Sequence, residues 1–115
     1  MKKIIAAIII AAAVVLTACG SEIPENMTQS TYDYGCQALE IMEKYNAAEI
    51  SEEDAKDRLE GIKKTIDAER ENLSDLLESS SALLVSNKAQ MFIFAIGGNG
   101  STYEIEKSLR EELGK

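Results

Sequence analysis

The hydrophobic pattern divides the chain into an apolar leader and a longer part with helical periodicity. Residues 4–16 are all Ile, Ala, Val or Leu, and two lysines, Lys2 and Lys3, precede them. A basic start, a short apolar stretch and small residues at its end are typical of a secretory signal peptide. Even when extended to Ala18, the stretch is shorter than the roughly 20 residues that a spanning helix needs. We therefore expect a cleaved leader over residues 1–18, with an uncleaved membrane anchor as the alternative.

Apolar residues after the leader recur at helical spacing. A first stripe has spacings of four and three residues, the period of a helix and not of a strand: Tyr34, Ala38, Ile41, Tyr45 and Ala48. Ser30 and Asp33 stand three residues apart ahead of it, which is a start like a capping box. The pattern therefore predicts a helix over about residues 31–48.

The second stripe is longer and has a clear start. Ser51 precedes a run of acidic residues, so its hydroxyl can accept a hydrogen bond from the backbone N–H of Asp54. The acids would lie at the positive end of the helix dipole. One face is apolar apart from Glu69: Ala55, Leu59, Ile62, Ile66, Leu73 and Leu76. This pattern predicts a helix over about residues 52–72, after a corner at residues 46–49.

The last third of the chain allows two interpretations. Residues 82–85 and 91–96 are short apolar runs, and a run of this length is either a buried strand or part of a helix. Because the neighbouring segments are helical, we expect a helix over about residues 81–96, after a break at residues 79–81. A hairpin over residues 82–96 is the alternative.

Glycines and a second capping box mark the end of the chain. Residues 97–100, Gly-Gly-Asn-Gly, predict a loop, and Ser101 with Glu104 begins a last helix. That helix carries Ile105, Leu109 and Leu113, and Gly114 ends it. The elements together predict an all-α fold, a small three- or four-helix antiparallel bundle over residues 30–115.

Composition and charge restrict the partners of this domain. Loss of residues 1–18 would remove Lys2 and Lys3, which changes the formal charge from −8 to −10 and leaves 97 of the 115 residues. Nucleic-acid binding depends on Lys and Arg that neutralise phosphates, and docking to anionic lipid uses basic clusters. The acidic domain is therefore not expected to bind nucleic acid or to dock electrostatically on lipid.

The candidate chemistry points away from catalysis. The chain has no histidine, which excludes His-based triads and His metal sites. The acids Glu52, Glu53, Asp54 and Asp57 lack the alternating pattern of a calcium loop and are better explained as a helix start. Residues 97–100 lack the Lys-Ser or Lys-Thr of a phosphate-binding loop. We expect no enzyme activity, no cofactor and no metal ion.

Two kinds of side chain remain as candidates for a functional role. Cys36 would lie opposite the first apolar stripe and so be exposed, but Asp33, Gln37 and Glu40 beside it do not activate a thiol. We therefore expect an inert cysteine. Three tyrosines on the first helix suit either the core or an interface, and the helical spacing favours the core: Tyr32, Tyr34 and Tyr45.

The end of the leader carries the most specific motif. Leu16-Thr17-Ala18-Cys19 resembles the lipobox of bacterial lipoproteins. The resemblance implies that the Cys19 thiol receives a diacylglyceryl group, that cleavage before it makes Cys19 the new N-terminus, and that this terminus is acylated, for example with palmitate. Residues 19–29, with the only proline, Pro24, would then form a lipidated N-terminus and a flexible stalk. The alternative is an ordinary Cys19 that pairs with Cys36 in a disulfide.

The resemblance also sets the expected function. It implies an exported protein, held by lipid at the cell membrane or outer envelope, whose helical domain is a non-catalytic protein-interaction or envelope module. Its partner would be an envelope or extracellular protein. Residues 46–59 further resemble small helical lipoproteins of gut bacteria whose role is unassigned. The alternative is a lipoprotein that binds a small ligand or ion, which a pocket lined by Tyr and Asn beside residues 97–101 would favour.

Overall fold

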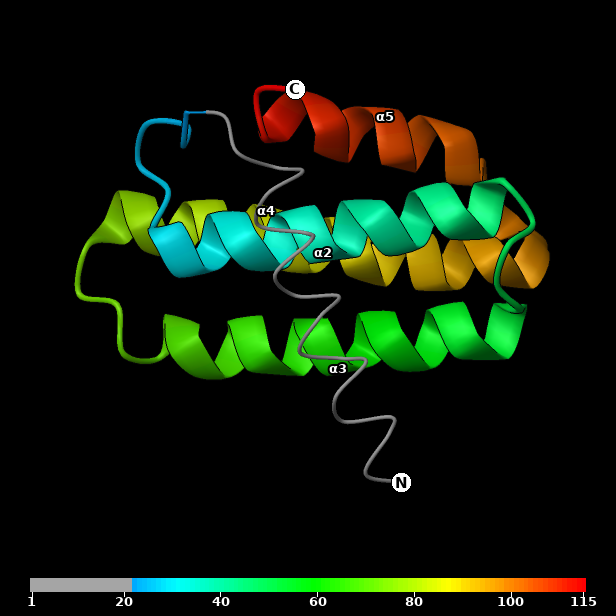
Figure 1. Cartoon of the computed structure of the whole chain (residues 1–115). Helices are drawn as coiled ribbons and strands as arrows, with labels where there is room; N and C mark the ends of the chain where they lie inside the picture. Colours follow the sequence, from blue (N-terminus) through cyan, green and yellow to red (C-terminus); the bar gives the residue numbers. More distant parts are fainter. Residues whose placement is uncertain (1–21) are drawn as a thin grey trace, which may run out of the picture.

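Four α-helices form an antiparallel bundle over residues 22–115, the part of the chain that the computed structural model describes (Figure 1). The helices are α2 (Gln29–Asn46), α3 (Glu52–Arg70), α4 (Leu76–Phe94) and α5 (Thr102–Glu112), and a π-helical turn, Ala95–Asn99, continues α4. The predicted all-α bundle is confirmed, and residues 82–94 are helix and not a hairpin. The predicted leader and Cys19 lie outside the described residues.

Each helix starts at a side-chain cap. The oxygens of Thr28, Ser51, Asp75 and Ser101 accept hydrogen bonds from the backbone N–H three residues further on, which satisfies one of the free donors of the first turn. The caps predicted at Ser51 and Ser101 are confirmed. The start predicted at Ser30 is wrong, because Thr28 caps α2 and Ser30 lies inside the helix.

The start of α4 also differs from the prediction. The break expected at residues 79–81 is absent, since the helix begins at Leu76 behind the Asp75 cap and runs through the three serines. A strong cap upstream thus overrides the weak helix preference of serine. Leu76, assigned from the sequence to the α3 stripe, therefore belongs to the first turn of α4.

The core lies where α2 and α4 meet each other and the two flanking helices. In Figure 1, α2 lies in front of α4, with α3 on one side of the pair and α5 on the other. Phe92 of α4 is fully buried and its ring meets Tyr45 of α2 edge to face, with centroids 5.8 Å apart. Tyr32 is also buried, so the tyrosines of α2 serve the core, as expected.

Cys36 is buried, which corrects the expected exposure. Its side chain is only 3% exposed and belongs to the core cluster. The expectation assumed that α2 buries one stripe, but α2 packs against three other helices and so buries much more of its circumference. The Cys36 sulfur is disulfide-bonded and not a free thiol; the other cysteine of the chain, Cys19, lies outside the described residues.

A glycine lets α5 approach α2 closely. A Cβ atom added at Gly35 would lie 2.7 Å from Cδ2 of Leu113, which is itself fully buried just after α5. Carbon atoms in contact normally lie about 3.5–4.0 Å apart. No side chain larger than hydrogen therefore fits at Gly35 unless Leu113 moves.

A partly buried polar link joins α3 to α4. The hydroxyl of Ser86, 1% exposed, donates to Asp67 Oδ1 at 2.7 Å, and Lys63 donates to Asp67 Oδ2 at 2.9 Å. Burial by itself would raise the pKa of Asp67, but these two hydrogen bonds and the charges of Lys63 and Arg70 lower it below its usual value. These contacts thus favour the ionised form of Asp67.

A second polar link joins α2 to α5 at the surface. Arg110 donates to Glu43 of α2 at 2.5 Å and to Glu106 of its own helix at 2.7 Å. The hydrogen bonds that Arg110 donates to both carboxylates raise its pKa. Asn46 extends the link by donating to Glu106 at 2.7 Å. The polar edge of the α2–α5 contact is therefore formed by side chains from both helices.

The segment before α2 lies against the bundle. Ile23 and Met27 pack on the core, and the ring of Pro24 lies close to Gly114. Figure 1 shows this segment and the C-terminus at the same end of the molecule. The described part of the expected stalk, residues 22–28, is thus in contact with the helices.

Candidate functional site

The helix α4 is apolar on both sides, unlike the other α-helices of residues 22–115. Its inner side is buried in the core through Ala82, Val85, Ala89 and Phe92. Its outer side carries six exposed large apolar residues, here termed the α4 face: Leu76, Leu77, Leu83, Leu84, Met91 and Phe94. A helix that is hydrophobic all round is normally buried all round, so the outer side of α4 is the exception in this fold.

The α4 face is regular and uncharged. Leu77, Leu84 and Met91 follow each other at intervals of seven residues, which places them in one row along the helix. Ser80 and Asn87 lie between this row and the other apolar residues, and all exposed residues of α4 are either apolar or one of these two. On an acidic chain this is a surface with no charge of its own.

The face is large for a domain of this size. Leu76 is 79% exposed and Phe94 63%, while Leu84 and Met91 are close to half exposed. If a fully exposed large side chain presents on the order of 150–200 Å², the six residues present about 500–650 Å² of apolar surface. The largest apolar patch of an ordinary monomer measures about 300–600 Å², and patches of this size mark interaction sites.

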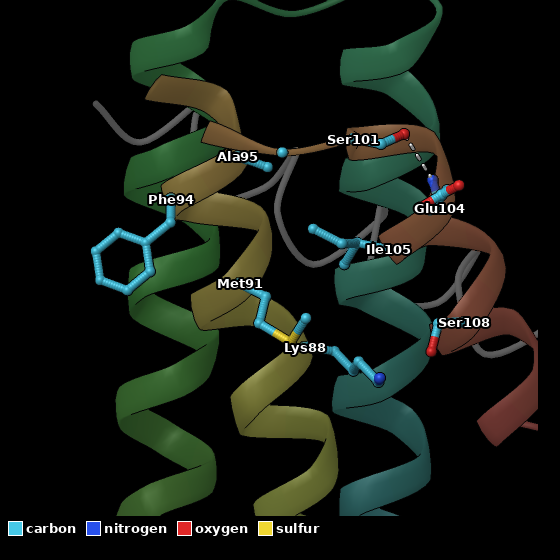
Figure 2. A pocket seen from close by; sticks show the side chains of 9 residues that line it. Lys88, Met91, Phe94, Ala95, Ser101, Glu104, Ile105 and Ser108 are labelled. Atoms are coloured by element: carbon cyan, nitrogen blue, oxygen red, sulfur yellow. Dashed lines mark hydrogen bonds between the residues drawn. The ribbon is translucent and has the colours of Figure 1, made fainter. Parts of the chain in front are cut away.

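A pocket lies beside the end of this face, between α4 and α5. Its volume is about 370 Å³, and Figure 2 shows the side chains that surround it, which include Lys88, Met91, Phe94, Ser101, Glu104 and Ile105. The Ser101 hydroxyl already accepts a hydrogen bond from the Glu104 backbone N–H, at 3.3 Å. The pocket occupies the place where a ligand site was considered, but Tyr and Asn are not among its lining residues.

The residues singled out from the sequence do not come together in one site. Cys36 is buried on α2, whereas the acids of residues 52–57 lie around the capped start of α3. Within residues 22–115, no group of three or more acids, cysteines or histidines is placed to hold a metal ion. Burial, and then hydrogen bonding to the Glu69 carboxylate, raises the pKa of Tyr34, which ties its hydroxyl to the contact between α2 and α3.

The α4 face was not predicted from the sequence, although the sequence carries a signal for it. The leucine pairs 76–77 and 83–84 are seven residues apart, and the inner positions of the same helix are also apolar. Because Leu76 was assigned to the preceding helix and residues 79–81 to a break, the outer row was divided between two elements. Extending one helix across the serines would have shown it.

Comparisons with known proteins identify neither a family nor a function for this chain. Comparison with protein-family models, curated proteins and solved structures gave no match for this chain. Within the described residues, 22–115, the helices are too short or too polar to cross a membrane.

Proposed function

We propose that this chain is a bacterial lipoprotein whose exported helical domain is a non-catalytic protein-interaction module of the cell envelope. The lipid anchor is Cys19, and the partner docks on the α4 face. The leader and the lipobox-like Leu16-Thr17-Ala18-Cys19 support the anchor. Two or three acyl chains on one residue would hold the domain firmly at a membrane, whereas a single chain binds only marginally.

The observation that carries the interaction role is the exposure of six large apolar residues in one uncharged face. Water-exposed apolar surface is unfavourable by roughly 25 cal/mol per Å², so covering 500–650 Å² of it would supply on the order of 13–16 kcal/mol before the costs of association. Those costs are about 4–15 kcal/mol. A protein surface that covers the face thus has enough driving force for specific binding.

The anchor is tested by metabolic labelling. The precursor, its Cys19→Ser variant and, as a matched control, its Cys36→Ser variant are expressed in bacteria with labelled palmitate. We expect label in the precursor and in Cys36→Ser, and none in Cys19→Ser. Equal label in the precursor and Cys19→Ser would end the lipoprotein proposal.

The same experiment separates the anchor from the disulfide alternative. The structure pairs Cys36 in a disulfide, and the only other cysteine of the sequence is Cys19. A thioether to lipid would use that same Cys19 sulfur, so one molecule cannot have both, and the proposed lipidated chain would carry Cys36 as a buried thiol. An unlabelled precursor whose two thiols react with maleimide only after reduction would establish the disulfide instead. The Cys36→Ser variant shows whether burial of residue 36 in the core, rather than a disulfide, is sufficient for folding.

The interaction role is tested by site-specific photo-crosslinking in intact cells. A photoreactive residue replaces Leu84 on the α4 face or, as a control, Gly61, which is exposed on α3 with no side chain within 4 Å. We expect a discrete protein adduct from position 84 and none from position 61. Absence of any adduct at 84, or the same adducts at both positions, would contradict a role for the face.

The alternative of a small-ligand or ion-binding lipoprotein has less support. Four of the nine residues that line the pocket between α4 and α5 are polar, namely Lys88, Ser101, Glu104 and Ser108. The Ser101 hydroxyl already caps α5, and the Tyr and Asn side chains expected at a ligand site are not among the lining residues. Binding sites for small ligands combine apolar walls with several convergent polar groups that are free to bind. The pocket is better explained as the end of the apolar face, with which it shares Met91 and Phe94.

A further inference from the structure

We propose that the partner of the α4 face is a second copy of this chain, and that the two α4 helices pair antiparallel about Leu84. The inference rests on the proposed role of the α4 face in binding a protein, and it identifies that protein as a second copy of the chain. It follows from the symmetry of the exposed row, from the area of the face and from its lack of charge.

The exposed residues are arranged almost symmetrically around Leu84. Leu77 lies seven residues before it and Met91 seven residues after it, so an antiparallel pair brings Leu77 of one copy opposite Met91 of the other. The two Leu84 side chains then meet at the twofold axis. Ser80 and Asn87, four residues before and three after, come to the same level and place hydroxyl against amide. Apolar residues thus meet apolar residues, and polar residues meet polar ones.

The two ends of the face match in the same arrangement. Leu76 lies eight residues before Leu84 and Phe94 ten residues after it, which brings the two most exposed side chains of the α4 face together at both ends of the pair. Isologous contacts of this kind require one patch that is complementary to itself. The α4 face satisfies that requirement along its whole length.

The helix dipoles favour the antiparallel over the parallel pair. The only charged residues of α4 are Glu78 in its first turn and Lys88 in its second half. Neither residue belongs to the α4 face, so charge does not set the direction of the pair. The helix dipoles do, because they oppose each other only when the helices are antiparallel.

The available area suits a dimer of moderate strength. Two faces of about 500–650 Å² would bury about 1,000–1,300 Å² in total, the lower part of the range for specific interfaces. We expect a dissociation constant on the order of micromolar in solution. Anchoring both copies in one membrane would raise their effective concentration and favour the pair.

A lipid surface fits the same face less well. Helices that lie in the membrane interface carry Lys and Arg around their apolar side, but the exposed residues of α4 include neither. The chain is also strongly acidic and would be repelled by anionic headgroups. A second copy requires no basic residues, because the whole contact is uncharged.

Cysteine crosslinking in bacterial membranes tests the pairing and its direction. Single cysteines are placed at Leu77, Leu84, Met91 and, as a control, Gly61 in the full-length chain, in two differently tagged versions. We expect disulfide dimers from L84C alone and from L77C mixed with M91C, and none from L77C alone or from G61C. A disulfide forms only where two Cα atoms come within about 7 Å. Absence of the L84C dimer, or dimers from L77C alone without the mixed pair, would overturn the proposal.

Sedimentation of the detergent-solubilised chain gives an independent measure of the same contact. L84E places two carboxylates at the twofold axis and is expected to weaken the dimer at least roughly tenfold. G61E adds the same group on exposed α3 and is expected to leave the dimer unchanged. Both residues are exposed in the monomer, and circular dichroism of each variant checks that the helices are intact. An L84E variant that is as dimeric as G61E would refute the pairing.

The outcomes also separate this inference from the proposed function. A monomeric chain that still forms a photo-adduct with a different protein at position 84 would overturn the second copy and leave the interaction role. A monomeric chain without adducts would overturn both. Co-flotation of the Cys19→Ser chain with phosphatidylcholine–phosphatidylglycerol vesicles, abolished by L84E, would identify lipid as the occupant and overturn the dimer.

Discussion

The clearest quantitative prediction concerns two glycines in the middle of helices. Gly35 and Gly61 both lie inside helices, where replacement by Ala favours the helix by about 1 kcal/mol. A methyl group at Gly61 meets nothing within 4 Å, whereas at Gly35 it would lie 2.7 Å from Leu113. Overfilling a packed core costs about 1–3 kcal/mol. We therefore expect Gly61→Ala to stabilise the fold by about 1 kcal/mol and Gly35→Ala to change it by about 0 to −2 kcal/mol.

The difference is measurable by thermal and urea unfolding in a common Cys19→Ser background. For a domain of this length, 1 kcal/mol corresponds to a shift in Tm of about 4–8 °C. Gly61→Ala should therefore raise the Tm by about that amount, and Gly35→Ala should leave it unchanged or lower it. The same helical gain applies to both variants, so the difference between them measures the contact with Leu113.

A third variant identifies the cause. Leu113→Ala alone should cost about 2–5 kcal/mol, because it leaves a cavity in the core. In the Leu113→Ala background, the methyl group of Gly35→Ala no longer meets the leucine side chain, so the substitution should stabilise the fold. Two results would refute the reasoning: a Gly35→Ala variant as stable as Gly61→Ala, or an unchanged cost of Gly35→Ala once Leu113 is shortened.

Three further predictions concern the caps and the partly buried polar link. Ser51→Ala removes the cap of α3 and should cost about 1 kcal/mol, whereas Ser30→Ala, expected from the sequence to be a cap, should cost far less; urea unfolding compares them. Ser86→Ala removes a hydrogen bond from Asp67 and should cost about 1–3 kcal/mol at neutral pH, measured by the same assay. The lowered pKa of Asp67 means that its ionised form stabilises the fold above about pH 4, the unfolded value, and that this contribution is lost as pH falls through the lower folded value. The stability difference between the wild type and Asp67→Asn should therefore shrink below about pH 4, and a difference independent of pH would contradict the assigned charge.

Local signals in the sequence were enough for the helices that have a strong cap and one apolar stripe. Ser51 with its acids defined α3, and Ser101 with Leu109 and Leu113 defined α5, because both the start and the buried side are encoded within a few residues. The start of α2 was misplaced by two residues, since Thr28, Ser30 and Asp33 all offer an oxygen. In the structure Thr28 is the cap, and Met27 and Tyr32 on either side of it pack in or against the core.

Features that depend on several helices could not be read in this way. The burial of Cys36 follows from the contacts of α2 with three neighbours, which no periodicity in α2 reports. The link between Asp67 and Ser86 joins residues 19 positions apart and looks in the sequence like two surface residues. The α4 face was missed for a different reason: its row was divided between two predicted elements. In addition, apolar residues all round a helix have no periodicity that assigns an inner and an outer side.

The packing of Pro24 near Gly114 has a consequence for how a lipidated chain would stand on its membrane. Cys19 precedes Glu22 by three residues, which reach at most about 10 Å when extended. An acylated N-terminus would therefore sit under the end of the bundle that also carries the C-terminus. In a twofold antiparallel pair with both anchors in one bilayer, the rotation axis must be perpendicular to the bilayer plane. The long axes of the two molecules would then be parallel to the lipid surface, and the two lipid anchors would lie at opposite ends of the pair.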